Sequence, residues 1–573
     1  MPPRRFPWVS LIAAVAAGLV SYSAFTPAGW WLATPAAAAA LYLVLRSAGP
    51  WRGFGLAAAF GLAQFLPMLT WAYKAAGWLP YLALSVTSAG LLALAAVVYG
   101  YARWLVPGFR GAGRGRRAGR RGNAAGAASR TAGGAGWTSA SVADAVLFAL
   151  ALTAADGWRQ FFPFGGFPWG RLGFTQVGGP MARWAWLGGV SLVGLAAVLA
   201  GCLAVVLAAA LVGVARRRDT GSAGGTGQPG AGRPGRRPSW AGNSWRGLGL
   251  AAGGVALTVA GPLLAPISAA AEGGTLMVGA VQGDVEVSAE GLFTRQREVL
   301  ENHVEVSLEL ASSVGAGALD VVLWPENSTD IDPRVDDSAY AAIDQAAAAL
   351  DAPVLVGAMQ YVGRANRYNQ GLLWRPGLGV VDIYSKRHPA PFAEYMPARS
   401  FFRVFTDKVD LIDTDMLAGE TIGVMPFDAA VLGREVALGD IICFEVAYDA
   451  IVGDVVRAGA EFVVVQTNNA SFGFSQEATQ QFAMTRLRAI EHGRATVQIS
   501  TVGVSAAVAP DGSLLTPLTS LFEPAFFTAS LPLRTSTTPA TRIGGAVGWA
   551  LMIAPLALAV AGLGARLGRR RSR

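Results

Sequence analysis

Charged side chains are scarce in this sequence. Only 14% of the 573 residues are Asp, Glu, Lys or Arg, whereas soluble globular proteins average about 25%. This composition, in which 53% of the residues are hydrophobic, excludes an ordinary soluble protein and indicates a membrane protein. Acidic residues are rare before Glu272 and frequent from there to about Asp511, so the chain joins an apolar part to a polar part.

Cysteine and histidine are also scarce. Cys202 lies in an apolar segment and Cys443 in the polar region, so no disulfide framework can form within the polar region. His303, His388 and His492 are scattered, and no Cys/His spacing typical of a metal ligand set occurs. We therefore expect neither a metal nor a cofactor.

Long apolar runs fill most of the chain before residue 272. They have roughly the 17–25 residues that a helix needs to cross a bilayer, although the second is marginal, and tryptophans at several of their ends are typical of the membrane interface. A signal peptide is the alternative for the first run, but further apolar runs follow it at once. We predict eight transmembrane helices, at Trp8–Phe25, Trp30–Leu45, Phe54–Tyr73, Trp78–Leu105, Trp137–Ala155, Trp184–Val214, Leu248–Ile267 and Ile543–Leu563.

Arginine clusters separate several of these runs. Two Gly- and Arg-rich segments, 107–136 and 215–247, have little to pack and are predicted to be disordered. Together with Arg4, Arg5 and the tail Arg569–Arg571 they fall on alternate connections, which the positive-inside rule places in the cytoplasm. Nucleic-acid binding is the alternative for such loops, but cytoplasmic membrane loops carry this charge anyway, so we expect no nucleic-acid partner. By parity, the polar region lies on the extracytoplasmic side of the cytoplasmic (inner) membrane.

The polar region alternates short apolar runs with amphipathic segments. Strands are expected at 276–281, 321–324, 354–357, 371–374, 436–442, 462–466, 496–500 and 504–508, and helices at 293–311, 446–456 and 478–490. Such alternation over about 260 residues favours one α/β domain of ordinary size. The predicted organisation is thus a membrane bundle over 1–272, an α/β domain over 273–538, and an eighth span with a basic tail over 539–573.

Three reactive side chains follow predicted strands of this domain. Glu326 ends V-V-L-W-P-E, Lys386 follows V-V-D-I-Y-S, and Cys443 stands where a strand stops and a helical pattern begins. Because strand ends at one edge of a sheet converge on a crevice, we expect carboxylate, ammonium and thiol to meet there. Glu326 could then take the thiol proton, Lys386 could hold the thiolate and a developing oxyanion, and Cys443 could attack a carbonyl.

Each of these residues also has an ordinary structural explanation. Buried cysteines are common, a Glu after Trp-Pro is often a cap or turn carboxylate, and a Lys before Arg-His-Pro is usually a solvated charge. The occurrence of all three, in order, at strand ends favours a nucleophilic site. Cys443 stands at the turn into the helix expected at 446–456, and the backbone N–H groups and dipole at the start of that helix are expected to lower the pKa of its thiol.

The motifs W-P-E, Y-S-K-R-H and I-C-F-E resemble those of the nitrilase superfamily, and the whole chain is similar to its bacterial apolipoprotein N-acyltransferase family. Further similar segments are P-F-A-E-Y-M-P, T-N-N-A-S-F-G and R-L-R-A-I-E-H-G-R. The resemblance implies an α-β-β-α sandwich with a Glu-Lys-Cys triad, and it marks four residues as substrate-binding or supporting: Glu394, Tyr395, Phe444 and Glu445. The family usually has Tyr where Phe444 stands, and it often has a Trp shortly after the V-Q-G stretch, where this chain has none before Trp324.

The resemblance also implies a two-step acyl transfer at the membrane. Cys443 takes an acyl chain from a membrane phospholipid as a thioester, and the α-amine of diacylglyceryl-cysteine on a lipoprotein accepts it, with Glu326 moving the protons. Two alternatives stay open. A membrane-anchored nitrilase-type amidohydrolase would not need seven spans before the domain, and a non-catalytic scaffold for a lipid glycosyltransferase would not need an intact triad.

Overall fold

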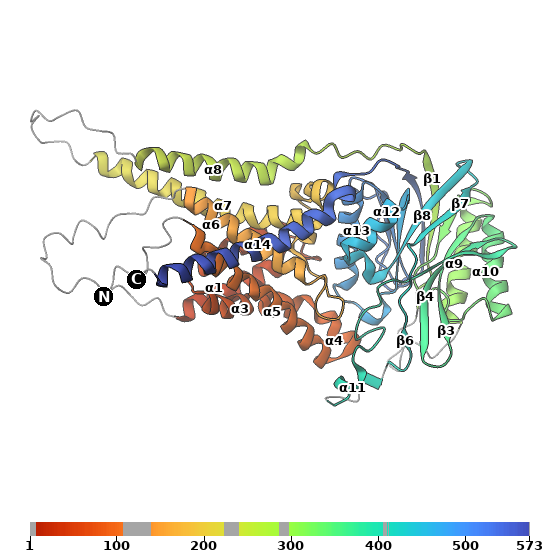
Figure 1. Ribbon diagram of the computed structural model, residues 1–573. Coiled ribbons are helices and arrows are strands. Elements are labelled where there is room, and N and C mark those ends of the chain that lie inside the picture. Colours follow the sequence, from red (N-terminus) through yellow and green to blue (C-terminus); the bar gives the residue numbers. More distant parts are fainter. Residues whose placement is uncertain are drawn as a thin grey trace, which may run out of the picture.

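The computed structural model describes residues 7–106, 139–222, 240–285, 297–404, 409–410 and 412–571. It has two parts: a long helical bundle, and an α/β domain that sits at one end of the bundle (Figure 1). The last helix starts beside the α/β domain and runs along the bundle toward its far end.

Apolar helices build the bundle. Alanine, leucine and valine dominate them, and small residues let neighbouring helices approach closely: a Cβ on Gly61 would lie 2.8 Å from the Ala89 backbone of the adjacent helix. The helices are α1 (Pro7–Tyr22), α2 (Ala33–Leu45), α3 (Pro50–Met68), α4 (Thr70–Ala76), α5 (Trp78–Ala102), α6 (Ser139–Trp158), α7 (Ala185–Ser222), α8 (Trp240–Ala260) and α14 (Pro539–Arg571).

Length and composition support fewer spans than the eight predicted. Among the described residues, five helices are long and apolar enough to cross a membrane, and a sixth results if α3 and α4, bent by 57°, form one span. Helices α1 and α2 have only 16 and 13 residues. At about 1.5 Å per residue they are shorter than a hydrocarbon core of about 30 Å.

The two arginine-rich segments lie largely outside the described residues, which omit 107–138 and 223–239. The ends of the second segment differ from the prediction, because α7 extends to Ser222 and α8 begins at Trp240. Residues 215–222 and 240–247 are therefore helical, although their composition led us to expect disorder.

Asp144 is a charged side chain inside the bundle, and it is fully paired. Asp144 of α6 accepts hydrogen bonds from the Tyr42 and Tyr99 hydroxyls, at 2.9 Å each, and from Arg103 Nε at 3.1 Å. A charge removed from water is tolerated only with such partners, so this cluster fixes α2, α5 and α6 relative to one another.

The α/β domain is a sandwich of two sheets. The first sheet has the order β12-β1-β2-β3-β4-β5, with β6 beside β4, and the second has the order β11-β10-β9-β8-β7. Apolar side chains from both sheets meet between them. The strands are β1 (Thr275–Gln282), β2 (Val321–Leu323), β3 (Val354–Val362), β4 (Asn366–Arg375), β5 (Gly379–Ser385), β6 (Asp415–Met416), β7 (Val424–Ala429), β8 (Arg434–Ile442), β9 (Phe462–Thr467), β10 (Ala495–Ser500), β11 (Ala506–Val508) and β12 (Ala525–Pro532).

Helices cover both outer faces of the sandwich. Helices α9 (Glu298–Val314) and α10 (Asp337–Leu350) pack their apolar stripes on the first sheet. Helices α12 (Asp449–Arg457) and α13 (Glu477–His492) cover the second sheet and lie between it and the bundle (Figure 1). The α-β-β-α layering implied by the resemblance is therefore present, and the predicted pairing of 496–500 with 504–508 is confirmed as the antiparallel pair β10–β11.

A buried ion-pair cluster joins the domain to the bundle. Arg171, from the loop before α7, and Arg488 of α13 both bind Asp449 Oδ1, at 2.7 and 2.8 Å. Burial alone would raise the pKa of Asp449, but the two guanidinium groups lower it to about 2. Close approach also requires Gly189 in α7, because a Cβ there would lie 2.5 Å from Glu491 Oε1. The bundle is thus packed directly against the layer of the domain that contains α13.

Candidate active site

The three reactive residues lie just beyond three strand ends. Glu326 lies three residues after β2, while Lys386 and Cys443 directly follow β5 and β8. The expectation that these strands share one sheet is wrong, since β2 and β5 belong to the first sheet and β8 to the second. The side chains meet because the two sheets face each other, a relationship that only the tertiary structure sets.

Glu326 and Lys386 form a buried pair. Lys386 Nζ lies 3.3 Å from Glu326 Oε1 and 2.6 Å from Glu394 Oε1. Glu326 also accepts hydrogen bonds from Asn369 Nδ2 to Oε1 (2.6 Å) and from the Asn468 backbone N–H to Oε2 (2.8 Å). Both carboxylate oxygens of Glu326 are therefore held, which fixes the direction in which it can exchange a proton.

Cys443 stands on a sharp backbone turn at the end of β8. Its φ is +53°, in the left-handed region that non-glycine residues rarely adopt, and such strained residues cluster at functional sites. The thiol is half-buried rather than sealed in the core. Thr467 Oγ1 and Gln481 Nε2 lie 3.3 and 3.6 Å from Sγ, so polar groups surround the sulfur.

The charges at the site oppose ionisation of the thiol. Burial raises the pKa of Cys443 well above its usual range, the Glu326 charge raises it further, and Lys386 only partly offsets this. The expectation of a lowered thiol pKa is therefore wrong for the free protein. The helix that was expected to lower this pKa is also short at this point, because β8 is followed by a 3-10 helix of five residues, Cys443–Ala447 (η6).

The partners of the thiol have shifted pKa values as well. Burial raises the pKa of Glu326, against the opposing effect of Lys386. Burial alone would lower the pKa of Lys386, but Glu326 and Glu394 raise it well above its usual range. The free site thus contains a neutral thiol, a lysine held as a cation, and a carboxylate whose raised pKa suits proton transfer from the thiol.

The supporting residues named from the sequence lie around this group. Glu394 receives Lys386 through Oε1 and the Ala390 N–H through Oε2 (2.7 Å). The Tyr395 hydroxyl points to the Phe164 carbonyl at 3.5 Å, which links the segment after Lys386 to the bundle. Glu394 therefore touches the reactive lysine, whereas Tyr395 contacts the loop beside it.

Glu445 fastens the turn that carries the thiol. Its carboxylate accepts hydrogen bonds from the Ile442 N–H (2.9 Å), the Tyr384 hydroxyl (2.9 Å to Oε2), and the Arg387 and His388 N–H groups (2.7 and 3.0 Å). These donors come from both the β8 and the β5 ends. Glu445 therefore holds the Cys443 turn against the Lys386 segment across the two sheets.

Phe444 faces the bundle. Its ring stacks on Phe167 and Trp169, with centroids 5.5 and 5.7 Å apart. Both partners belong to the aromatic loop Phe161–Arg171, which lies between α6 and α7. The same loop accepts a 2.8 Å hydrogen bond from the Tyr448 hydroxyl at Gly166 and exposes Phe161, Phe162 and Phe164. It lies beside the site and offers an apolar surface there.

Several residues of the site were not predicted from the sequence. Asn369 and Gln481 contact Glu326 and Cys443, and Glu477 is buried close enough to the thiol for its charge to raise the pKa of Cys443. Asn468 lies within the T-N-N-A-S-F-G stretch, which was a usable signal. Asn369 is an ordinary strand residue by sequence, and its role depends on the pairing of β4 with its neighbours.

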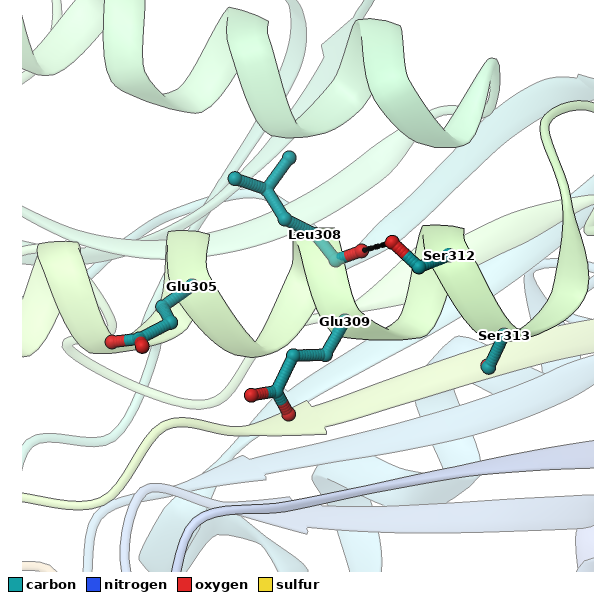
Figure 2. Close-up of a pocket in the computed structure, with 5 residues that line it drawn as sticks. All are labelled: Glu305, Leu308, Glu309, Ser312 and Ser313. Carbon is teal, nitrogen blue, oxygen red and sulfur yellow. Dashed lines mark hydrogen bonds between the residues drawn. The ribbon is translucent and has the colours of Figure 1, made fainter.

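A hollow elsewhere in the domain is separate from this group. It has a volume of about 530 Å³ and lies along the outer face of α9, where Glu305, Leu308, Glu309, Ser312 and Ser313 line it (Figure 2). None of the three reactive residues lines it. Within the described ranges, no group of three or more His, Cys, Asp or Glu side chains could hold a metal ion.

Both parts of the chain match known protein families. Residues 17–203 match the profile of the apolipoprotein N-acyltransferase N-terminal domain, and residues 278–538 match that of the carbon-nitrogen hydrolases. The apolipoprotein N-acyltransferase of Mycolicibacterium smegmatis is 33% identical over 565 residues, which cover 96% of this chain and 84% of that protein. The one from Azotobacter vinelandii is 28% identical over 528 residues, covering 88% and 86%.

Solved amidase structures align with about half of this chain. An amidase of the nitrilase superfamily from Nesterenkonia, in a Cys-to-Ala variant, aligns with 48% of this chain and 95% of its own, at 15% identity and a TM-score of 0.35. Another structure of an amidase from Nesterenkonia covers the same shares at 16% identity and a TM-score of 0.34.

Proposed function

This chain belongs to the apolipoprotein N-acyltransferase family, and from that premise we propose that Cys443 carries an acyl chain from a membrane phospholipid to a lipoprotein. The acceptor is the α-amine of diacylglyceryl-cysteine at the lipoprotein N-terminus. One observation carries the proposal: Lys386 Nζ lies between Glu326 and Glu394, at 3.3 and 2.6 Å, beside a half-buried thiol on a strained turn.

The first step forms the thioester. Glu326 takes the proton of Cys443, and the thiolate attacks the ester carbonyl of the phospholipid. Lys386 and the Phe444 backbone N–H stabilise the tetrahedral oxyanion. Collapse of this intermediate breaks the ester C–O bond, and Glu326 passes its proton to the lysophospholipid oxygen. The raised pKa of the thiol makes the base necessary, since little thiolate exists at neutral pH.

The second step consumes the thioester. The α-amine of the acceptor attacks the same carbonyl, the C–S bond breaks, and Glu326 moves a proton from nitrogen to sulfur. Glu394 keeps Lys386 directed at the oxyanion through both steps, and Glu445 keeps the Cys443 turn in place. Glu326, Lys386 and Cys443 are the catalytic residues of this proposal; Glu394 and Glu445 are positioning residues.

The surroundings support a reaction between two membrane-anchored substrates. The bundle lies against the α13 side of the domain (Figure 1), and the loop Phe161–Arg171 brings exposed phenylalanines beside Phe444. Acyl chains can enter along this apolar surface, and low water content there protects the thioester from hydrolysis. We place the protein in the cytoplasmic (inner) membrane as a multi-pass protein with the α/β domain (273–538) outside, as the arginine distribution predicts.

The comparisons do not favour the amidohydrolase or the scaffold. A direct test incubates the purified full chain with phospholipid and a diacylglyceryl-cysteine peptide, and measures the peptide by mass spectrometry. The proposal predicts one added acyl group on the peptide N-terminus, absent with Cys443→Ala. Release of free fatty acid without acylated peptide would support the hydrolase instead, and full activity of Cys443→Ala would support the scaffold.

A further inference from the structure

In the second step the acceptor nitrogen must lose two protons, and Glu326 alone cannot accept both. An α-amino group has a pKa of about 7.7–8.0 and arrives largely as an ammonium ion at neutral pH. Its nitrogen carries three protons on arrival and one in the product amide, so two must leave. One of them goes to the Cys443 sulfur through Glu326. The other needs a second acceptor, because the Glu326 carboxylate carries only one proton at a time and Lys386 is a cation.

A second carboxyl group lies in the same place. Glu477, in the first turn of α13, is only 2% exposed, and its Oε2 has no hydrogen-bond partner among the described residues. One helical turn later on the same helix, Gln481 points its Nε2 at Cys443 Sγ, 3.6 Å away. Residues i and i+4 lie on one helix face, so Glu477 shares the face of α13 that meets the nucleophile. A buried carboxyl oxygen without a hydrogen-bond partner costs free energy. A ligand that donates a hydrogen bond to Oε2 would remove this cost.

We propose that Glu477 receives the ammonium group of the acceptor and takes its first proton, which leaves a neutral amine beside the Cys443 thioester. This inference rests on the function proposed above. The balance is complete: the ammonium gives one proton to Glu477, and the resulting amine attacks the thioester carbonyl. Glu326 then moves a second proton from nitrogen to the departing sulfur. Glu477 loses its proton to solvent when the product leaves.

The environment of Glu477 suits this role. Burial raises its pKa well above that of an ordinary carboxyl, and the Glu326 charge raises it further. A carboxyl of ordinary pKa would be a poor acceptor for an α-ammonium proton, whereas one of raised pKa accepts it at smaller cost. An arriving cation also offsets the desolvation of the carboxylate, so the empty site favours a positively charged ligand.

The other titratable groups near α13 do not compete for this proton. Lys74 of α4 binds the Phe474 carbonyl close to the start of α13, but it is itself a cation. Cys443 faces Glu477 from η6, and it holds the acyl group in this step. Arg486, farther along α13, is a cation that donates to the Gly512 carbonyl. At the other end of α13 lie Arg171, Asp449, Arg488, Glu491 and His492.

The test separates the two steps in the full-length protein. Glu477→Gln keeps the shape and removes the charge. With phosphatidylglycerol and phosphatidylethanolamine as donors, we expect the variant to form the Cys443 thioester no more slowly than the wild type, because loss of the Glu477 charge lowers the pKa of the thiol. Transfer to a diacylglyceryl-cysteine peptide at pH 7 should fall about 10²-fold. The deficit should shrink as the pH rises through the pKa of the acceptor amine, because the amine then arrives neutral. Glu477→Asp, which retains a carboxylate, should recover most of the transfer rate.

A second acceptor makes the result decisive. An aminooxy analogue of the peptide is neutral at pH 7 and needs no first deprotonation, so Glu477→Gln and wild type should acylate it equally fast. An equal loss with both acceptors, an unchanged pH profile, or slower thioester formation would each overturn the role of Glu477. Failure of the wild-type protein to form any thioester would refute the proposed function instead, so the two failures are distinguishable. Glu309→Gln, on the exposed face of α9, is the matched control.

Discussion

Replacement of Glu394 by Gln tests how the site holds its lysine. Lys386 Nζ is 2.6 Å from Glu394 Oε1 and 3.3 Å from Glu326 Oε1, so Glu394 is the nearer of its two carboxylates. The Gln side chain can keep only one of the two acceptor contacts of Glu394, to Lys386 or to the Ala390 N–H. The lysine then turns toward Glu326, which becomes a weaker base. Lys386 also stabilises the oxyanion less, because it no longer points at it.

The size of the effect follows from these contacts. A hydrogen bond to a charged group contributes about 1.5–3 kcal/mol, and only part of the Lys386 interaction is lost because Glu326 remains. Complete loss of this free energy from the transition state would slow thioester formation about 10- to 150-fold, so the partial loss expected here sets this range as the upper bound. The ground-state affinity for phospholipid should change little, since Glu394 touches Lys386 rather than the apolar surface beside Phe444.

The direction in which the pH–rate profile of thioester formation shifts in Glu394→Gln can also be predicted. Burial raises the pKa of Glu326, and the Glu394 charge raises it further, so removal of that charge lowers it. Thioester formation requires ionised Glu326, and its rate falls as the pH drops through that pKa. The acid limb of the pH–rate profile should therefore move to lower pH in Glu394→Gln. Stopped incubations with phospholipid, followed by intact-protein mass spectrometry, give the rate at each pH.

Two outcomes would refute this reasoning. An acid limb that stays in place, or moves to higher pH, would mean that Glu394 does not act on Glu326. A rise in KM without a fall in kcat would place Glu394 in substrate binding. Glu309→Gln, which removes an exposed carboxylate on α9, controls for the loss of one negative charge.

Further predictions concern the thiol, the interface and the aromatic stack. Because burial and the Glu326 charge raise the pKa of Cys443, iodoacetamide should alkylate it more slowly than free cysteine at pH 7, and Glu326→Gln should shift its alkylation profile to lower pH. Arg488→Ala leaves Asp449 and Glu491 buried without this partner, so unfolding should become easier by about 3–5 kcal/mol, seen as a lower Tm in detergent, whereas Arg542→Ala on exposed α14 surface should not change it. Phe444→Ala removes the stack on Trp169 and Phe167, so the KM for phospholipid should rise while thioester still forms at saturating lipid.

Much of the fold could be predicted from the sequence because local patterns of apolar and polar residues determine its helices and strands. Apolar runs and their tryptophan ends indicated the bundle, and short β-branched runs indicated β8 and β9. Reactive residues directly after strands indicated Lys386 and Cys443. The first two spans were predicted too long, because the apolar composition extends beyond the helices: α1 ends at Tyr22 rather than Phe25, and α2 begins at Ala33 rather than Trp30.

The rest could not be predicted because it depends on contacts between distant segments. Glu326 and Cys443 follow strands of different sheets. The convergence of strand ends at the edge of a single sheet therefore does not explain why they meet. The raised pKa of the thiol comes from burial and from Glu326, neither of which is visible around Cys443 in the sequence. Glu477 looks like an ordinary charge in the first turn of a helix, and only its burial beneath the bundle and its lack of a partner distinguish it.

The acyl-enzyme is the most direct test of the whole account. The purified protein is mixed with phospholipid, without acceptor, and its intact mass and the peptide that contains Cys443 are measured. The account predicts one acyl group on Cys443 that neutral hydroxylamine releases and that the diacylglyceryl-cysteine peptide removes, with no adduct in Cys443→Ala. An adduct on another residue, or acylated peptide formed without any acyl group passing through Cys443, would contradict it.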